Sequence, residues 1–305
     1  EEKVELSGKT GEPIPTDSVT TKIAELEKRG YTVENKEPLK GETFDKNKDP
    51  ENGDPTQVFK LLVKERTVEV TTPPTPNTPV DPNIPDGPKW PETGLAKSDL
   101  EKEVTRTITY VKKETADGPE EPSGKEPVTQ PAHFKRSATY NLVTKVVTPG
   151  DWGSTDNTLT AVPTEKLEGY IADRASVEAV TVPDTSGNIT EKVVYTKLGS
   201  WVPNLPKGVT PPEGTDMTPK PYPNHPTDPT KPGDPTPGLI PYVPGYTPNV
   251  GGTPLVPKNP TDLTEGYTPP TPTDPKTNIE INYTPDPQKA VVKVYTIRDG
   301  VKIEL

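Results

Sequence analysis

Proline is the residue that most limits what this chain can fold into, since it makes up 44 of the 305 residues. Proline fixes the backbone φ angle and has no amide hydrogen, so it is excluded from helix interiors and from most central strands. Eight prolines lie between residues 73 and 91, and twenty-four lie between residues 203 and 287. We therefore predict folded modules in tandem, joined by proline-rich segments in an elongated molecule.

The composition excludes several classes of function. Only 28% of the residues are hydrophobic, so each core is small, as in short modules arranged in a row. The chain has no cysteine, which removes disulfides and thiolate sites for zinc or catalysis. A net charge of −11 with no basic stripe argues against nucleic acid as a partner. No apolar run is long enough for membrane insertion, and no carboxylate pair indicates an enzyme.

Residues 1–72 predict a small α+β domain. The spacing of Val19, Ile23 and Leu26 gives one apolar stripe on a helix over residues 18–29. Strands are predicted around this helix at residues 3–6, 31–33, 57–63 and 67–71, with a turn at 64–66. This order of elements is typical of a β-grasp (ubiquitin-like) fold. Residues 73–96 form a proline-rich linker, for which we predict extended polyproline II backbone.

Residues 97–289 predict a β-rich, nearly all-β domain. Apolar and polar residues alternate over 104–112, 134–147 and 193–196, as strands require. The proline-rich arm at 199–286 contains repeated tyrosines, and we expect these to hold the arm against the rest of the domain.

The last segment, residues 290–305, predicts the start of a further repeat. A strand at 290–297, a turn at 298–300 and a strand at 301–305 form a hairpin. Its final residues, Lys302-Ile303-Glu304-Leu305, nearly repeat Lys3-Val4-Glu5-Leu6. The opening domain lacks a first strand, which a segment like 290–297 would supply.

Trp152 is the strongest candidate for a sugar contact, since a glycine- and aspartate-flanked loop can expose its ring for stacking. Lys135 and Arg136 are candidate cations for acidic glycans. Trp90 and Trp201 lie beside prolines, so we expect them to pack against the proline runs. His133 and His225 are distant in sequence and predict no metal site. A lysine–asparagine isopeptide cross-link stays open.

Calcium is the one cofactor that the sequence makes worth considering. Oxygen-bearing side chains alternate in a loop, and such spacing can direct several ligands toward one cation. The alternative is a solvated acidic loop. The candidate ligands are Asp45, Asn47, Asp49 and Asp54.

The order of several short motifs resembles the mucus-binding protein repeats (MucBP and related families) of lactobacilli and other Gram-positive bacteria. The motifs are residues 6–14, 28–31, 86–91, 104–110, 134–136, 150–152, 169–170, 199–204 and 242–248. The resemblance implies a β-grasp first domain, a β-rich second domain and no catalytic residues. It also implies a cell-wall-anchored parent protein on the bacterial surface that adheres to mucin glycans.

Three functions remain open from the sequence. The first is binding of mucin glycans, in which repetition along the parent chain supplies avidity for a weak single site. The second is a structural spacer that holds an adhesive tip away from the cell wall. The third is binding of immunoglobulins through the first domain, which the resemblance implies for some members.

Overall fold

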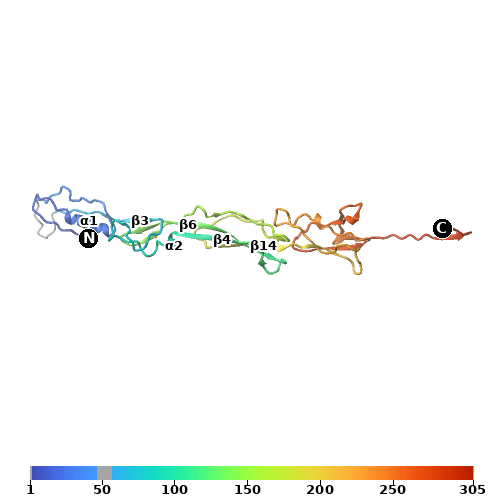
Figure 1. Ribbon diagram of the computed structural model, residues 1–305. Helices are drawn as coiled ribbons and strands as arrows, with labels where there is room; N and C mark the ends of the chain where they lie inside the picture. Colours follow the sequence, from blue (N-terminus) through green and yellow to red (C-terminus); the bar gives the residue numbers. More distant parts are fainter. Residues whose placement is uncertain (1, 47–56, 305) are drawn as a thin grey trace. The chain divides into compact units, whose positions relative to one another are not determined.

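The computed structural model describes residues 2–46 and 57–304, and it is mostly β with few helices (Figure 1). The chain divides into two compact units. The first comprises Glu1–Thr105, Pro131–Leu159 and Thr181–Gly187. The second comprises Arg106–Gln130, Thr160–Val180 and Asn188–Leu305.

The first unit begins with the predicted helix, α1 (Asp17–Lys28), whose stripe of Val19, Ile23 and Leu26 is buried. Gly30 ends the helix with a φ of 97°, and a Cβ there would lie 2.7 Å from the carbonyl oxygen of Leu142. Only glycine therefore fits. Strand β1 (Tyr31–Val33) then pairs antiparallel with β2 (Val63–Glu65).

Two predicted strands in this region are wrong. Residues 3–6 form no strand, and the strand expected at 57–63 is present only as β2, which covers part of the expected turn. Among the described residues, the hydrogen bonds of residues 60–62 go to Glu34 and Asn35, so no second described strand pairs with this segment. With only two strands present here among the described residues, the β-grasp assignment stays a prediction.

Residues 73–96 fold back on themselves and do not form the extended polyproline II backbone expected of them, while their assignment as a linker stays a prediction. The amide of Asn77 donates to the carbonyl of Trp90 at 3.0 Å, and the amide of Trp90 donates to Thr78 at 3.0 Å. The Trp90 ring packs on Tyr140 with 5.9 Å between centroids, and the Tyr140 hydroxyl donates to Lys89 at 3.0 Å. This aromatic contact holds the segment as a loop in place of an extended spacer.

Beside this loop, β3 (Thr67–Val70) pairs with β7 (Ala138–Asn141), which in turn pairs with β8 (Val147–Pro149). Helix α2 (Lys97–Leu100) adds Leu100 to the core of this sheet. β3 belongs to the predicted first domain, yet it pairs with β7, which belongs to the predicted second domain. The domain boundaries given above stay predictions.

The second unit contains a sheet built on β4 (Glu101–Lys113) and β14 (Ile189–Lys197), which run parallel. β11 (Tyr170–Ala172) pairs with β14, β5 (Glu121–Pro122) pairs with β4, and β6 (Val128–Lys135) also pairs with β4. Two other short strands of this unit are β10 (Val162–Pro163) and β12 (Ser176–Val177). β9 (Thr158–Leu159) belongs to the first unit, and β13 (Val180–Thr181) has one residue in each unit.

Arg106, on β4, is fully buried in this unit. Its guanidinium donates to the Gln130 side chain, to the Glu178 carbonyl at 2.7 Å and to the Thr160 carbonyl at 2.6 Å. Glu191 lies 3.6 Å away and supplies the opposite charge. One side chain thus connects four separate segments, a role that sequence analysis did not assign to it.

The proline-rich stretch forms its own mixed five-stranded sheet, in the order β16-β15-β21-β17-β18. The strands are β15 (Ser200–Asn204), β16 (Lys220–Pro221), β17 (Tyr246–Val250), β18 (Thr253–Pro254) and β21 (Ile279–Pro285). β19 (Val256–Pro257) pairs with β20 (Tyr267–Thr268), and two short 3-10 turns, η1 (Thr236–Gly238) and η2 (Leu263–Glu265), complete the stretch.

Buried aromatic side chains form the core of this stretch. Trp201 and Tyr222 lie 4.6 Å apart edge to face, and Tyr267 and Tyr283 join them with Ile240. The tyrosines are therefore core residues as well as contacts. The expected arm is in fact a sheet with its own core, to which β11 and Leu198 also contribute.

Asp-x-Thr sequences order the loops of this stretch. In each, the aspartate carboxylate accepts hydrogen bonds from both the amide and the hydroxyl of the threonine two residues later, as at Asp228, Asp234 and Asp262. These bonds favour the ionised carboxylate and lower the pKa of all three aspartates.

The chain ends in a hairpin of β22 (Tyr295–Arg298) and β23 (Val301–Glu304). Asp299 and Gly300 have φ angles of 52° and 76°, as a type I′ turn requires. The predicted hairpin is confirmed, but its first strand begins at Tyr295, since residues 290–294 form no strand.

Replacing Arg106 should destabilise the second unit. We expect Arg106→Met to lower the free energy of unfolding by about 3–5 kcal/mol, because it leaves buried partners without their charge and donors. Urea unfolding followed by circular dichroism measures this. Arg174→Met is the matched control, since Arg174 is 43% exposed and should change stability by about 0.5 kcal/mol or less. Equal effects of the two changes would contradict the assigned role.

Acid should loosen the proline-rich sheet. The folded pKa values of Asp228 and Asp234 lie below the unfolded value, so their stabilisation is present above about pH 4 and is lost as the pH falls through the folded values. Near-ultraviolet circular dichroism of the aromatic core between pH 5 and pH 2 reports this loss. In the variant D228N/D234N, the amide oxygen keeps the turns but does not titrate. An unchanged acid profile in that variant would refute the explanation.

Candidate functional site

The loop between β8 and β9 carries Trp152 and is fixed at two points. Gly153 and Lys135 exchange both backbone hydrogen bonds, at 2.8 and 2.9 Å, which attaches the loop to the end of β6. The carboxylate of Asp156 accepts from the His133 amide at 2.9 Å and from the Ser154 hydroxyl at 3.0 Å. The Trp152 side chain is therefore held in a defined, half-buried position.

Two cations lie over the Trp152 ring. The Arg136 guanidinium carbon is 4.3 Å from the ring centroid, and Lys102 Nζ is 4.5 Å from it. Each such contact stabilises an exposed cation by about 0.5–1 kcal/mol. The π system that a sugar would stack on is thus already engaged by the protein's own charges.

Backbone carbonyls hold both cations in place. Arg136 Nε donates to the Asp99 carbonyl at 2.6 Å, and Lys102 Nζ donates to the Asp184 carbonyl. No described residue hydrogen-bonds the two terminal nitrogens of Arg136. The arrangement therefore presents a fixed, positively charged guanidinium edge, which is suited to a carboxylate or a sulfate.

An acidic cluster borders this site. His133 lies 2.7 Å from Asp156 through Nδ1 and 3.3 Å from Glu103 through Nε2. The hydrogen bond that the His133 ring donates to the Asp156 carboxylate raises the pKa of His133 and lowers the pKa of Asp156 to about 2. The two carboxylates thus favour the protonated histidine.

The structure brings together only part of the predicted set. Trp152 and Arg136 are in contact, whereas Lys135 pairs with Glu101 at 3.4 Å and is not among the cations at the ring. Lys102 was missed, because only the pairing of β4 with β6 places it near the loop. Of the calcium candidates, Asn47, Asp49 and Asp54 lie outside the described residues, and the Asp45 amide donates to Gln57 at 2.9 Å.

Within residues 2–46 and 57–304, no cluster of acidic, histidine or cysteine side chains could hold a metal ion. The same ranges contain no helix that is both long and apolar enough to cross a membrane.

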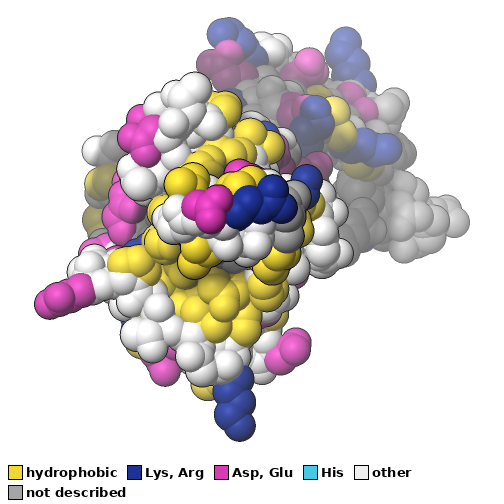
Figure 2. All heavy atoms as spheres, turned by 90° about the vertical axis from the view of Figure 1, so that its right-hand side faces the viewer, with side chains coloured by type: hydrophobic (Ala, Val, Ile, Leu, Met, Phe, Trp, Pro, Cys, Tyr) yellow, Lys and Arg dark blue, Asp and Glu magenta, His cyan; other side chains and the backbone are white. Residues whose placement is uncertain are grey.

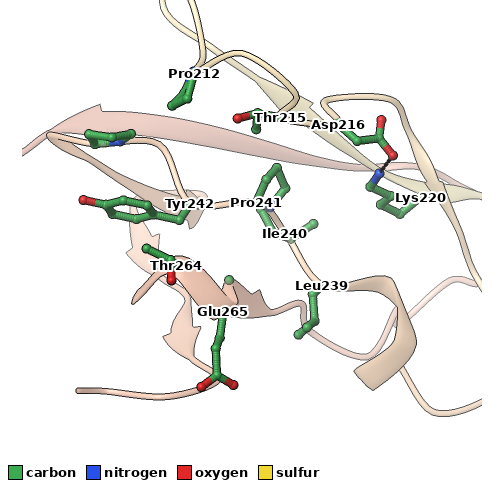
Figure 3. A pocket seen from close by; sticks show the side chains of 12 residues that line it. Pro212, Thr215, Asp216, Lys220, Leu239, Ile240, Pro241, Tyr242, Thr264 and Glu265 are labelled. Carbon is green, nitrogen blue, oxygen red and sulfur yellow. Dashed lines mark hydrogen bonds and ion pairs between the residues drawn. The ribbon is translucent and has the colours of Figure 1, made fainter. Parts of the chain in front are cut away.

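A separate groove of about 520 Å³ lies in the second unit (Figure 3). Tyr242, Pro241 and Leu239 form much of its wall, and its charged groups already have partners. Asp216 pairs with Lys220 at one end. The Glu265 carboxylate, which binds Asn259 and Lys258, points away from Tyr242. The groove is thus mainly apolar, with few polar groups left to fix a ligand.

Removing Trp152 should affect stability much less than removing Trp201. Trp152 is half-buried, so Trp152→Ala should cost about 1–2 kcal/mol for two cation–π contacts. Trp201 is fully buried, and Trp201→Ala should cost about 3–5 kcal/mol. Chemical unfolding of both variants makes the comparison. A loss at Trp152 as large as that at Trp201 would show that Trp152 is a core residue.

Comparison with known proteins gives one family and several related structures. Residues 95–199 match the sequence model of the Muc B2-like domain. A search of the curated proteins finds no match.

Three solved structures are similar to parts of the chain. Mub-RV is 24% identical, covers 63% of this chain and 88% of its own, and has a TM-score of 0.42. The type 2 repeat of the mucus binding protein MUB from Lactobacillus reuteri has the same identity and shares, with a TM-score of 0.35. The mucin-binding domain of Spr1345 from Streptococcus pneumoniae is 31% identical over 32% of this chain and 92% of its own, with a TM-score of 0.27.

Proposed function

This chain belongs to the mucus-binding protein repeat family, and we propose that it is a non-enzymatic adhesin repeat of the bacterial surface that binds acidic mucin glycans. The observation that carries the proposal is the Arg136 guanidinium, held with its central carbon 4.3 Å from the Trp152 ring centroid and with its terminal nitrogens unbonded by described residues. The names of the related structures support mucin as the partner.

Charge decides how such binding would work. The chain carries a net charge of −11, and mucin glycans with sialic acid or sulfate are also acidic, so the long-range force is repulsive. Attraction must come from cations placed at contact distance. Arg136 supplies a two-nitrogen fork for one carboxylate or sulfate, Lys102 adds a second charge, and the edge of Trp152 offers apolar contact for the sugar.

We propose that the site works through avidity, that is, through several repeats that bind at the same time. A single half-exposed anion site binds weakly, and mucin carries many copies of each terminal sugar. Several repeats along a parent chain would engage several glycans at once, which raises the overall affinity without any new contact. The spacer function predicts no binding at all, and immunoglobulin binding would use the first module instead of the site at Trp152.

A pair of neighbouring residues tests the site. Arg136→Gln and Lys135→Gln each remove one positive charge, but only Arg136 contacts Trp152. We expect R136Q to weaken binding to immobilised mucin about 10–100-fold, which corresponds to the loss of a charge-assisted hydrogen bond of about 1.5–3 kcal/mol. K135Q should stay within about twofold of the unaltered chain.

Two further measurements separate the alternatives. Mucin stripped of sialic acid and sulfate should bind the unaltered chain as weakly as native mucin binds R136Q. Tyr242→Ala, in the apolar groove, should bind normally. The proposal fails if the two glutamine variants lose binding equally, or if the unaltered chain does not bind mucin, which would favour the spacer.

A further inference from the structure

Unpaired backbone joins the proline-rich sheet to the terminal hairpin. Strand β21 ends at Pro285, and the Asp286 amide adds one more bond to this sheet, to the Gly245 carbonyl at 2.9 Å. The neighbouring strand β17 begins at Tyr246, and the chain before it turns away, so β21 has no neighbour beyond this point. β22 begins only at Tyr295. Residues 287–294 therefore form neither strand nor helix.

This segment is also uncovered. Every residue from 287 to 294 is exposed, and the exposed fractions of Val291 and Val292 reach 81% and 87%. No described residue hydrogen-bonds the backbone amides of residues 288–294. Figure 2 shows hydrophobic and basic side chains uncovered at the end of the chain that faces the viewer. Open amides and carbonyls over such a length suit a protein that binds a peptide as an added strand.

The segment presents a lysine to such a protein. Lys289 is exposed and forms no ion pair within the part of the chain that the structure describes. Lys293 pairs with Glu304 at 3.0 Å, but both side chains are more than half exposed, so this pair holds the lysine only weakly. Residues 287–304 carry four basic and two acidic side chains, although the whole chain has a net charge of −11. The segment is therefore locally positive and suits an acidic binding pocket.

Other exposed lysines of the second unit lie in backbone that is held in place. Lys207 and Lys276 each lie in a turn that a backbone hydrogen bond closes, at 3.1 and 3.3 Å. Lys220 and Lys231 are each followed by a proline. A protease reaches backbone inside a folded unit only through local opening, so the rate there falls with the population of the open form.

Residues 3–8 resemble the segment in forming no strand, but their neighbours attach them to the first module. Glu2 pairs with Arg29 at 2.7 Å, and Leu6 packs against the α1 core. Acidic residues also surround Lys3, since positions 1, 2 and 5 are all glutamate. This second stretch therefore offers neither open backbone nor positive surroundings.

We propose that residues 287–294 are a processing site for a protease of trypsin-like specificity, which cleaves after Lys289. The enzyme holds the segment as an extended strand, and its acidic pocket receives the Lys289 ammonium. Water adds across the Lys289–Ala290 amide, so Lys289 gains a carboxylate and Ala290 gains an amino group. The residues of the anion site and of the proline-rich sheet stay on one fragment. Where the parent chain continues, the cut would release an intact repeat, whatever that repeat binds.

Limited digestion of the full chain with trypsin, followed by mass spectrometry, tests the proposal. The double variant K289Q/K293Q removes both lysines of the segment, and K207Q/K276Q removes two lysines from hydrogen-bonded turns of the same unit. Each variant loses two positive charges. We expect the unaltered chain to be cut first after Lys289, K289Q/K293Q to be cut at least tenfold more slowly, and K207Q/K276Q to stay within about twofold of the unaltered rate.

The fragment that ends at Lys289 should keep its near-ultraviolet circular dichroism, because Trp201 and the aromatic residues packed around it all precede the cut. Three results would each overturn the proposal. They are a first cut at another described lysine or arginine, equal slowing in the two double variants, and loss of the aromatic signal when the chain is cut.

Discussion

A shortage of backbone donors shapes this chain. Every proline contributes a carbonyl but no amide hydrogen, so 44 prolines leave many acceptors that the backbone alone cannot satisfy. Aromatic side chains supply part of the missing donors. Trp201 Nε1 donates to the Pro270 carbonyl, Tyr283 donates to Pro241 and Tyr222 donates to Thr277. The same rings also provide the apolar volume of the core, which explains how a proline-rich stretch folds into a sheet with an interior.

The helix α1 and the terminal turn follow from local sequence signals, whereas the long-range pairing of strands does not. The α1 stripe and the Asp299-Gly300 turn depend on residues a few positions apart, so their patterns were sufficient. The prolines in β15 and β21 interrupt the alternation of apolar and polar residues that would identify these segments as strands. The two strands also pair in parallel although they lie far apart in the chain. The strand expected at 57–63 fails for the opposite reason. Its sequence favours a strand, but within residues 2–46 and 57–304 only β1 pairs with this part of the chain, at Val63–Glu65.

The candidate site shows the same division. Trp152 and Arg136 were identified from a loop pattern and from charge, but their mutual contact follows from the bridge between Gly153 and Lys135. Lys102 lies near the Trp152 ring only because β4 pairs with β6. That contact changes the chemistry proposed for the site. The Trp152 ring already contacts two cations and holds them in fixed positions. We therefore propose that the site binds an anion, in place of simple stacking of a sugar on the ring.

The parallel pairing of β4 with β14 has a mechanical consequence. Eight residue pairs join the two strands in register, from Arg106 with Ile189 to Lys113 with Thr196. When the chain is pulled from its two ends, tension enters β4 at its amino end and leaves β14 at its carboxyl end. The strands are then loaded in shear, so the hydrogen bonds between them share the force and must break together. A bacterium that held to a moving mucus layer through such a repeat would need this resistance to flow.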